Sequence, residues 1–117
     1  MSKITQNIDI SIIIVNFNGG RYIDSCLDSI FENNPSYSYE IIVIDNSSAD
    51  NSLDVLSHYK DKINLIPNVN NMGFSYANNQ GIKIAIGKYI FLLNNDTVLK
   101  PESLDTMINY FAQNSNI

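Results

Sequence analysis

Four short apolar segments, separated by segments of helical periodicity, constrain the fold more than any other feature. They are Ile10–Val15, Ile41–Ile44, Ile63–Ile66 and Tyr89–Leu93. The first is β-branched and nearly all apolar, which is typical of a strand buried on both faces. The second and fourth show the same pattern, and the third is shorter and ends at Pro67. The alternation predicts an α/β fold, a Rossmann-like parallel sheet with helices on both faces.

Each apolar segment is followed by a segment with apolar residues at helical spacing. Asn33, Asn34 and Pro35 are expected to end the first helix, and Gly87 is expected to end the third. Pro101 is expected to begin the last helix. The predicted helical faces are Tyr22–Phe31, Leu53–Leu56, Phe74–Ile86 and Leu104–Phe111.

Parallel sheets of this class bind ligands beyond the carboxyl ends of their strands. The polar loops that follow the predicted strands are therefore the expected functional loops. All four are rich in Asn, Asp, Ser or Gly. They are Asn16–Gly20, Asp45–Asp50, Asn68–Phe74 and Asn94–Thr97.

Composition excludes several classes of protein. The chain has 117 residues, about one domain, and its formal net charge of −5 argues against nucleic-acid binding. No Gly-x-Gly-x-x-Gly or Gly-Lys-Ser/Thr loop is present, and no apolar run approaches the roughly 20 residues of a membrane span. Cys26 is the single cysteine, so an internal disulfide is excluded and a cytoplasmic setting is expected.

Two carboxylates are the main candidates for binding chemistry. Asp45 follows a buried strand, where it can accept hydrogen bonds from a base or a ribose; no packing purpose is evident for a carboxylate there. Asp96 also follows a buried strand and can hold Mg²⁺ or Mn²⁺ together with diphosphate oxygens and waters. The alternative for Asp96 is a turn residue or a helix cap. The alternative for Asn16–Gly20 is a simple turn whose glycines give backbone freedom.

Jointly, these loops resemble the nucleotide-sugar-binding, N-terminal part of family 2 glycosyltransferases, which have the GT-A fold. The resemblance runs from about Ile10 to Pro101. It consists of four ordered motifs: the opening strand and nucleotide loop, an Asp-x-x-Ser-x-Asp loop, an Asn-x-Gly-Phe…Asn-x-Gly…Gly-Tyr stretch and a variant of the Asp-x-Asp motif. They lie at Ser11–Asn18, Glu40–Asp50, Asn71–Tyr89 and Leu93–Asp96.

The resemblance implies a role for each matching residue. The metal would be Mg²⁺ or Mn²⁺, and the ligand a nucleotide sugar. The implied roles are Asn16 and Asn18 lining the nucleotide cleft, Asp45 binding the base, Gly73 and Asn78–Asn79 packing near nucleotide and sugar, Asn94 approaching the ribose or sugar, and Asp96 binding the metal.

The chain departs from the family pattern in two places. Asn94 replaces the first aspartate of the usual pair, as in members that transfer rhamnose or related sugars, which implies a UDP- or dTDP-linked donor. The chain ends at Ile117, whereas the family carries its acceptor site and general base later, so no catalytic residue is identified. We therefore expect a truncated domain that transfers sugar poorly by itself and is prone to self-association.

The parent reaction implied is glycosyl transfer with inversion to a saccharide or lipid-linked acceptor, in polysaccharide synthesis. It would take place in the cytoplasm, with the full protein at the inner face of the membrane. One alternative is a non-catalytic module that binds a nucleotide or a partner. A nucleotidyltransferase would need a Gly-rich basic loop that Arg21 alone does not supply, and a phospho-acceptor domain would need acids where Asn16 and Asn18 stand.

Overall fold

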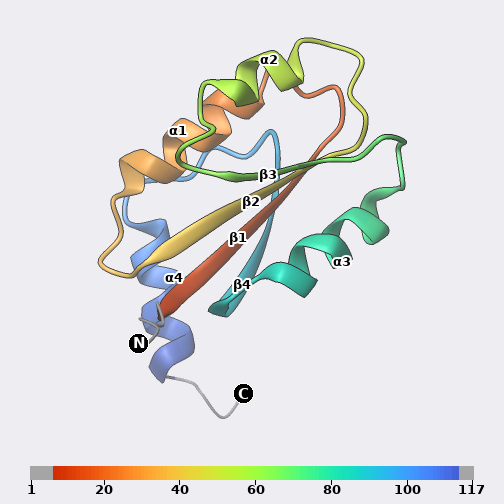
Figure 1. Ribbon diagram of the computed structural model, residues 1–117. Helices are drawn as coiled ribbons and strands as arrows, with labels where there is room; N and C mark the ends of the chain where they lie inside the picture. The colour runs from red at the N-terminus through yellow and green to blue at the C-terminus, as the bar shows by residue number, and fades with distance from the viewer. Residues whose placement is uncertain (1–6, 114–117) are drawn as a thin grey trace, which may run out of the picture.

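The computed structural model describes residues 7–113 and confirms the predicted alternation of strands and helices (Figure 1). Ile117, beyond which the general base is expected, lies outside the described residues. In chain order the elements are β1 (Ile8–Asn16), α1 (Ile23–Asn33), β2 (Tyr39–Asp45), α2 (Ser52–Ser57), β3 (Asn64–Pro67), α3 (Phe74–Ile84), β4 (Gly87–Asn94) and α4 (Ser103–Gln113).

The strands form one parallel sheet in the order β3-β2-β1-β4. β1 is therefore central, with β2 on one side and β4 on the other. Strand order reverses at β1, because β2 and β3 extend the sheet in one direction and β4 returns to the opposite side. A ligand crevice is expected at the carboxyl ends of the two strands beside such a reversal, here β1 and β4.

Helices cover both faces of the sheet, as predicted. In Figure 1, α3 lies on one face, while α1 and α2 lie on the other. Alternate residues of β1 supply the two cores, because side chains of a strand point to opposite faces in turn. Ile12 and Ile14 pack with α1, α2 and α4, whereas Ile13 packs toward α3 with Ile42, Ile44 and Ala77.

The prediction that Tyr89–Leu93 is buried on both faces is wrong. Exposure alternates along β4, and Ile90 and Leu92 are 42% and 54% exposed. Tyr89, Phe91 and Leu93 pack into the core beneath α1 and α4. The opposite face of β4 is open because α3 packs over β1 and β2 instead.

The prediction that Gly87 ends the third helix is also wrong. α3 ends at Ile84, Ala85 has extended backbone angles, and Gly87 is the first residue of β4. A Cβ atom at Gly87 would lie 2.5 Å from the backbone nitrogen of Ser11. The glycine is therefore explained by the close approach of β4 to β1. The predicted end of α1 is confirmed, with Asn34 in the left-handed conformation at φ 43°.

Candidate functional site

A cleft of about 450 Å³ lies at the carboxyl edge of the sheet, around the ends of β1 and β4. The ends of β1, β2 and β4 and the loop before α3 all contribute to it. Its position is the one that the strand order predicts for a ligand site. The lining residues are Val15, Phe17, Asn46, Asn71, Gly73, Phe74, Asn94, Asn95 and Asp96.

The structure brings three of the predicted site residues to this cleft, namely Gly73, Asn94 and Asp96. The other five predicted residues are not among the described residues that line it. Asn16 and Asp45 are fully buried behind its wall. Asn18 is exposed on the turn after β1. Asn78 is buried on α3, and its neighbour Asn79 is exposed.

Asp45 has a structural task that the sequence did not reveal. Its carboxylate accepts hydrogen bonds from the Asn16 side-chain amide (2.9 Å), the Ser48 hydroxyl (2.7 Å) and the Ser48 backbone nitrogen (3.0 Å). The inference that a carboxylate here has no packing purpose is therefore wrong. Asp45 joins the end of β1 to the loop after β2, and its contact with a base stays a prediction.

Asn18 joins the same two loops from the other side. It has φ 52°, a left-handed conformation that asparagine tolerates better than most residues. Its side-chain oxygen accepts a hydrogen bond from the Ala49 backbone nitrogen (2.7 Å), and its own backbone nitrogen donates to Ser48 Oγ (2.9 Å). Asn18 therefore holds the turn after β1 to the loop after β2.

Asn46 is a lining residue that the sequence reasoning missed. It is 2% exposed, and its Oδ1 accepts hydrogen bonds from Asn68 Nδ2 (3.0 Å) and the Met72 backbone nitrogen (3.3 Å). Its Nδ2 donates to the Gly73 carbonyl oxygen (3.1 Å). One side chain therefore shapes the loop before α3. The position of Asn46 directly after Asp45, at the end of a strand, was the sequence feature that could have identified it as a lining residue.

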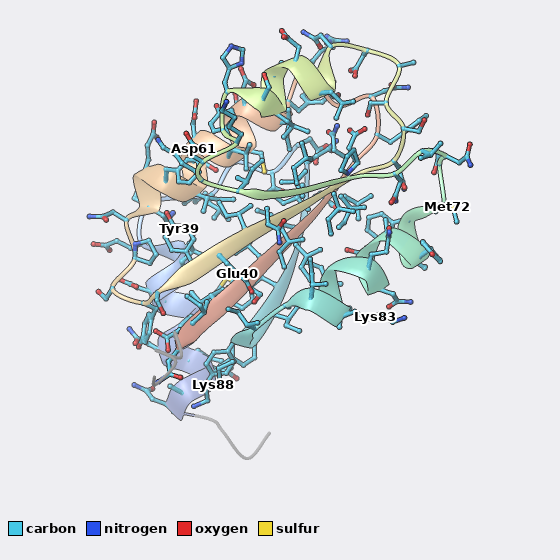
Figure 2. All side chains as sticks on the ribbon, viewed as in Figure 1. Tyr39, Glu40, Asp61, Met72, Lys83 and Lys88 are labelled. Carbon is cyan, nitrogen blue, oxygen red and sulfur yellow. The ribbon has the colours of Figure 1, made fainter. Side chains whose placement is uncertain are left out.

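The loop before α3 has a second anchor, a reciprocal pair of amides. Asn68 donates to Gln80 at 2.7 Å, and Gln80 donates back at 2.9 Å. Gly73 then turns the chain into α3 at φ 86°, in the region that favours glycine. Met72, labelled in Figure 2, marks this loop at the end of the molecule distant from Lys88.

Phe17 is another missed lining residue. It follows the end of β1, and 48% of its surface is exposed although it is a large aromatic side chain. An exposed ring in a cleft offers a flat apolar face, which suits stacking against a nucleobase.

Asp96 is the one carboxylate among the described residues that line the cleft, and it is exposed. Below it, Cys26 Sγ lies 3.7 Å from the Asn94 carbonyl oxygen. Burial, and then the negative charge of Asp96, raise the pKa of the Cys26 thiol to about 12.

The donor set of the cleft fits a hard cation that is completed by its ligand. Within residues 7–113, no group of three or more His, Cys, Asp or Glu residues could hold a metal by itself. Asp96 and the side-chain oxygen of Asn94 are oxygen donors of the kind that Mg²⁺ and Mn²⁺ prefer. Phosphate oxygens and waters would supply the remaining positions.

A second cavity, of about 400 Å³, lies between β4 and α4. Its lining is almost wholly apolar and includes Ile90, Leu92 and Met107, so it offers no groups for chemistry. Within the described part of the chain, no helix is long and apolar enough to cross a membrane.

The chain belongs to glycosyl transferase family 2, whose family model matches residues 11–117. The fold and the position of the cleft agree with this assignment. The resemblance inferred from the four sequence motifs is therefore confirmed.

Several relatives of this chain are described as bacterial glycosyltransferases. The poly(ribitol-phosphate) beta-glucosyltransferase of Bacillus spizizenii is 37% identical over 92% of this chain and 18% of that protein. The poly(ribitol-phosphate) beta-N-acetylglucosaminyltransferase TarP of Staphylococcus aureus is 31% identical over 92% of this chain and 34% of that protein. The chain thus spans about a fifth to a third of the length of these relatives.

Solved structures share the fold. S. aureus TarS in complex with UDP-GlcNAc matches with a TM-score of 0.77 and 23% identity, over 91% of this chain and 32% of that one. The mannosyltransferase PcManGT from Pyrobaculum calidifontis, in complex with GDP-Man and Mn²⁺, matches with a TM-score of 0.76 and 21% identity, over 90% and 32%. The predicted GT-A type fold is confirmed by these likenesses.

Proposed function

We propose that this chain forms the donor-binding part of a glycosyltransferase that uses a UDP- or dTDP-linked sugar. The observation that carries the proposal is the cleft at the carboxyl ends of β1 and β4. Three different groups line this cleft. They are the exposed carboxylate of Asp96, the exposed aromatic ring of Phe17, and the loop that turns at Gly73. These are groups suited to a metal-bound diphosphate, a base and a closely approaching ligand.

Each described group has a task in this proposal. Phe17 stacks against the base, and Asp96 holds the metal with help from the Asn94 side-chain oxygen. Mg²⁺ or Mn²⁺ held there would offset the charge that develops on the leaving diphosphate. The open rim at Gly73 leaves room for the sugar, since no described atom lies within 4 Å of where its Cβ would be.

The proposed acceptor chemistry is an inference from the family and the relatives. An acceptor hydroxyl attacks the anomeric carbon from the side opposite the diphosphate, which inverts that centre. The poly(ribitol-phosphate) transferases among the relatives favour an acceptor in cell-surface polysaccharide synthesis, either a saccharide or a lipid-linked chain. A cytoplasmic setting, at the inner face of the membrane for the full protein, agrees with the single buried thiol of Cys26.

A non-catalytic module that binds a nucleotide or a partner is the second candidate. It is favoured by one observation: among the described residues, the cleft lining contains no His or Glu, and no Asp besides Asp96, that could serve as a general base.

The first experiment is calorimetric titration of the chain with UDP and with dTDP, each with and without Mn²⁺. We expect Mn²⁺-dependent binding that Asp96→Ala weakens at least about tenfold, as for loss of a metal ligand. Asp61→Ala is the matched control. Asp61 is an exposed aspartate in the turn after α2, far from Met72 in Figure 2, and its removal should leave binding unchanged.

Two results would count against the proposal. Absence of binding by a folded wild-type chain would contradict the donor site. Binding that is equal with and without Mn²⁺, and unaffected by Asp96→Ala, would favour the non-catalytic module.

A further inference from the structure

We infer that Asn16 is a positioning residue, which sets the Asp96 loop in place through Asn95 and does not itself contact the ligand. The inference rests on the proposed donor site and assigns a new task within it. Asn16 has no exposed surface, whereas Asn95 and Asp96 both line the cleft. A residue without exposed surface can act on a ligand only through its neighbours.

The Asn16 side chain connects three strand ends. Its Nδ2 donates to Asp45 Oδ1 at 2.9 Å, and its Oδ1 accepts a hydrogen bond from Asn95 Nδ2 at 2.9 Å. Asp45 ends β2, and Asn95 follows the end of β4. The two bonds therefore link both neighbours of the central strand through one amide.

The sheet register explains why this position is the bridge. Asn16 pairs with Asp45 across β1 and β2, and Val15 pairs with Asn94 across β1 and β4. The last residue of the central strand is thus flanked on both sides. β2 and β4 do not pair with each other, so their ends need a connection through β1.

The chemistry of the two partners sets the orientation of the Asn16 amide. The carboxylate of Asp45 can only accept, so the Asn16 nitrogen must face it. The Asn16 oxygen then faces the other way and requires a donor, which Asn95 supplies. An aspartate at this position would bring two buried carboxylates together, and an alanine would leave both partners without this bond.

Gly19 supplies independent support for the same link. A Cβ atom at Gly19 would overlap both the Asn16 side-chain oxygen and the Asn95 side-chain nitrogen. The absence of a side chain at Gly19 therefore leaves the space in which this hydrogen bond forms.

For the site, this means that the position of Asp96 depends on the buried side chain of Asn16. Thr97 N–H donates to the Asn94 carbonyl oxygen at 3.1 Å, closing the loop that carries Asp96. Asn95 is the tethered residue of that loop. When the tether is lost, the loop should open more often and Asp96 should hold the metal less well.

The first test needs no nucleotide: amide hydrogen exchange at Thr97 in the free chain. We expect Asn16→Ala and Asn95→Ala each to speed exchange about fivefold, which corresponds to loss of one neutral hydrogen bond. Gly19→Ala should act in the same direction with both amides intact. Unchanged exchange in all three variants would overturn the inference.

Asn33→Ala is the matched control, because Asn33 also bridges distant segments. Its Nδ2 donates to the Lys100 carbonyl oxygen at 2.8 Å, and its Oδ1 accepts from the Leu104 backbone nitrogen at 3.2 Å. It lies at the end of α1 and not at the cleft. Its removal should lower stability without changing exchange at Thr97.

The second test is UDP binding with and without Mn²⁺. Asn16→Ala should weaken only the Mn²⁺-dependent binding, about fivefold, and should add little to Asn95→Ala in the double variant. Weakening of metal-free binding as well, with additive losses in the double variant, would show direct contact and overturn the inference. A general loss of stability would not separate the two conditions in this way.

The two proposals fail in different ways. If the wild-type chain binds neither nucleotide, the donor site is contradicted, while exchange at Thr97 still decides whether Asn16 places the loop. If Asn16→Ala does not fold, Asn95→Ala removes the same hydrogen bond from the half-buried side chain of Asn95, and Gly19→Ala obstructs it with both amides in place.

Discussion

The hydroxyl group of Ser11 donates a 2.6 Å hydrogen bond to a carboxylate oxygen of Glu40. The same oxygen accepts from the Ile86 backbone nitrogen at 2.8 Å, and the Ser11 oxygen accepts from the Gly87 backbone nitrogen at 2.8 Å. Figure 2 labels Tyr39 and Glu40, which point to opposite faces of β2. One carboxylate and one hydroxyl therefore join β1, β2 and the turn between α3 and β4.

Replacing Glu40 tests this junction. Glu40→Gln removes the charge, so that the two donors face a neutral amide oxygen in place of a carboxylate oxygen. We expect the free energy of unfolding to fall by about 2 kcal/mol, since hydrogen bonds to charged groups contribute about 1.5–3 kcal/mol. Urea denaturation measures the change. Glu32→Gln, an exposed glutamate on α1, should stay within about 0.5 kcal/mol, and an equal loss there would contradict the junction.

Gly87→Ala tests the close approach of β4 to β1. The added Cβ would lie 2.5 Å from the Ser11 backbone nitrogen, so the strands must shift. We expect a loss of stability of about 1–3 kcal/mol, as for overpacking in a core. Thermal unfolding checks it. A stabilised variant would mean that Gly87 limits the fold only through chain entropy.

Asn46→Ala should loosen the loop that carries Gly73. The variant loses three hydrogen bonds, to Asn68, Met72 and Gly73. We expect UDP affinity to fall at least about tenfold, because leaving buried partners unsatisfied costs about 1–3 kcal/mol. Limited proteolysis of the loop gives a second measurement. Asn51→Ala removes an exposed asparagine with no side-chain cap bond, and an equal fall in affinity there would contradict the role of Asn46.

The Cys26 thiol should be unreactive in the folded chain. Burial, with a contribution from Asp96, raises its pKa from 9.0 to about 12, so the thiol is neutral at pH 8. A disulfide reagent at pH 8 should label it only after unfolding in urea. A group with a raised folded pKa stabilises the fold below its unfolded pKa. This contribution should therefore be complete below about pH 9 and fall as the pH rises toward 12. Rapid labelling without denaturant would contradict the burial.

The order of strands and helices was predictable because burial on both faces leaves an unbroken apolar signature. Ile10–Val15 lies within β1, and Ile41–Ile44 lies within β2. The exposure of β4 was not predictable in this way. Whether a strand lies at the edge depends on pairing between segments that are distant in the sequence, and an apolar edge strand has the same local pattern as a central one.

The functional loops were predictable from the carboxyl-edge rule, which brings Asn94, Asp96 and Gly73 to the cleft. The individual contacts were not. Asp45 and Asn46 are neighbours at one strand end. Of these two residues, Asn46 is among the described residues that line the cleft and Asp45 is not. Which of two consecutive side chains turns toward a ligand depends on the register with the strands alongside. That register emerges only in the folded sheet.

The tethers behind this cleft are mostly carboxamides, namely those of Asn16, Asn18, Asn46, Asn68, Gln80 and Asn95. Carboxamides carry no charge and do not titrate near neutrality, so neither acid nor added salt acts on them directly. A binding site built in this way keeps its geometry while the medium changes. The dependence of ligand affinity on ionic strength should then report on the diphosphate and the cation, with little contribution from these carboxamides.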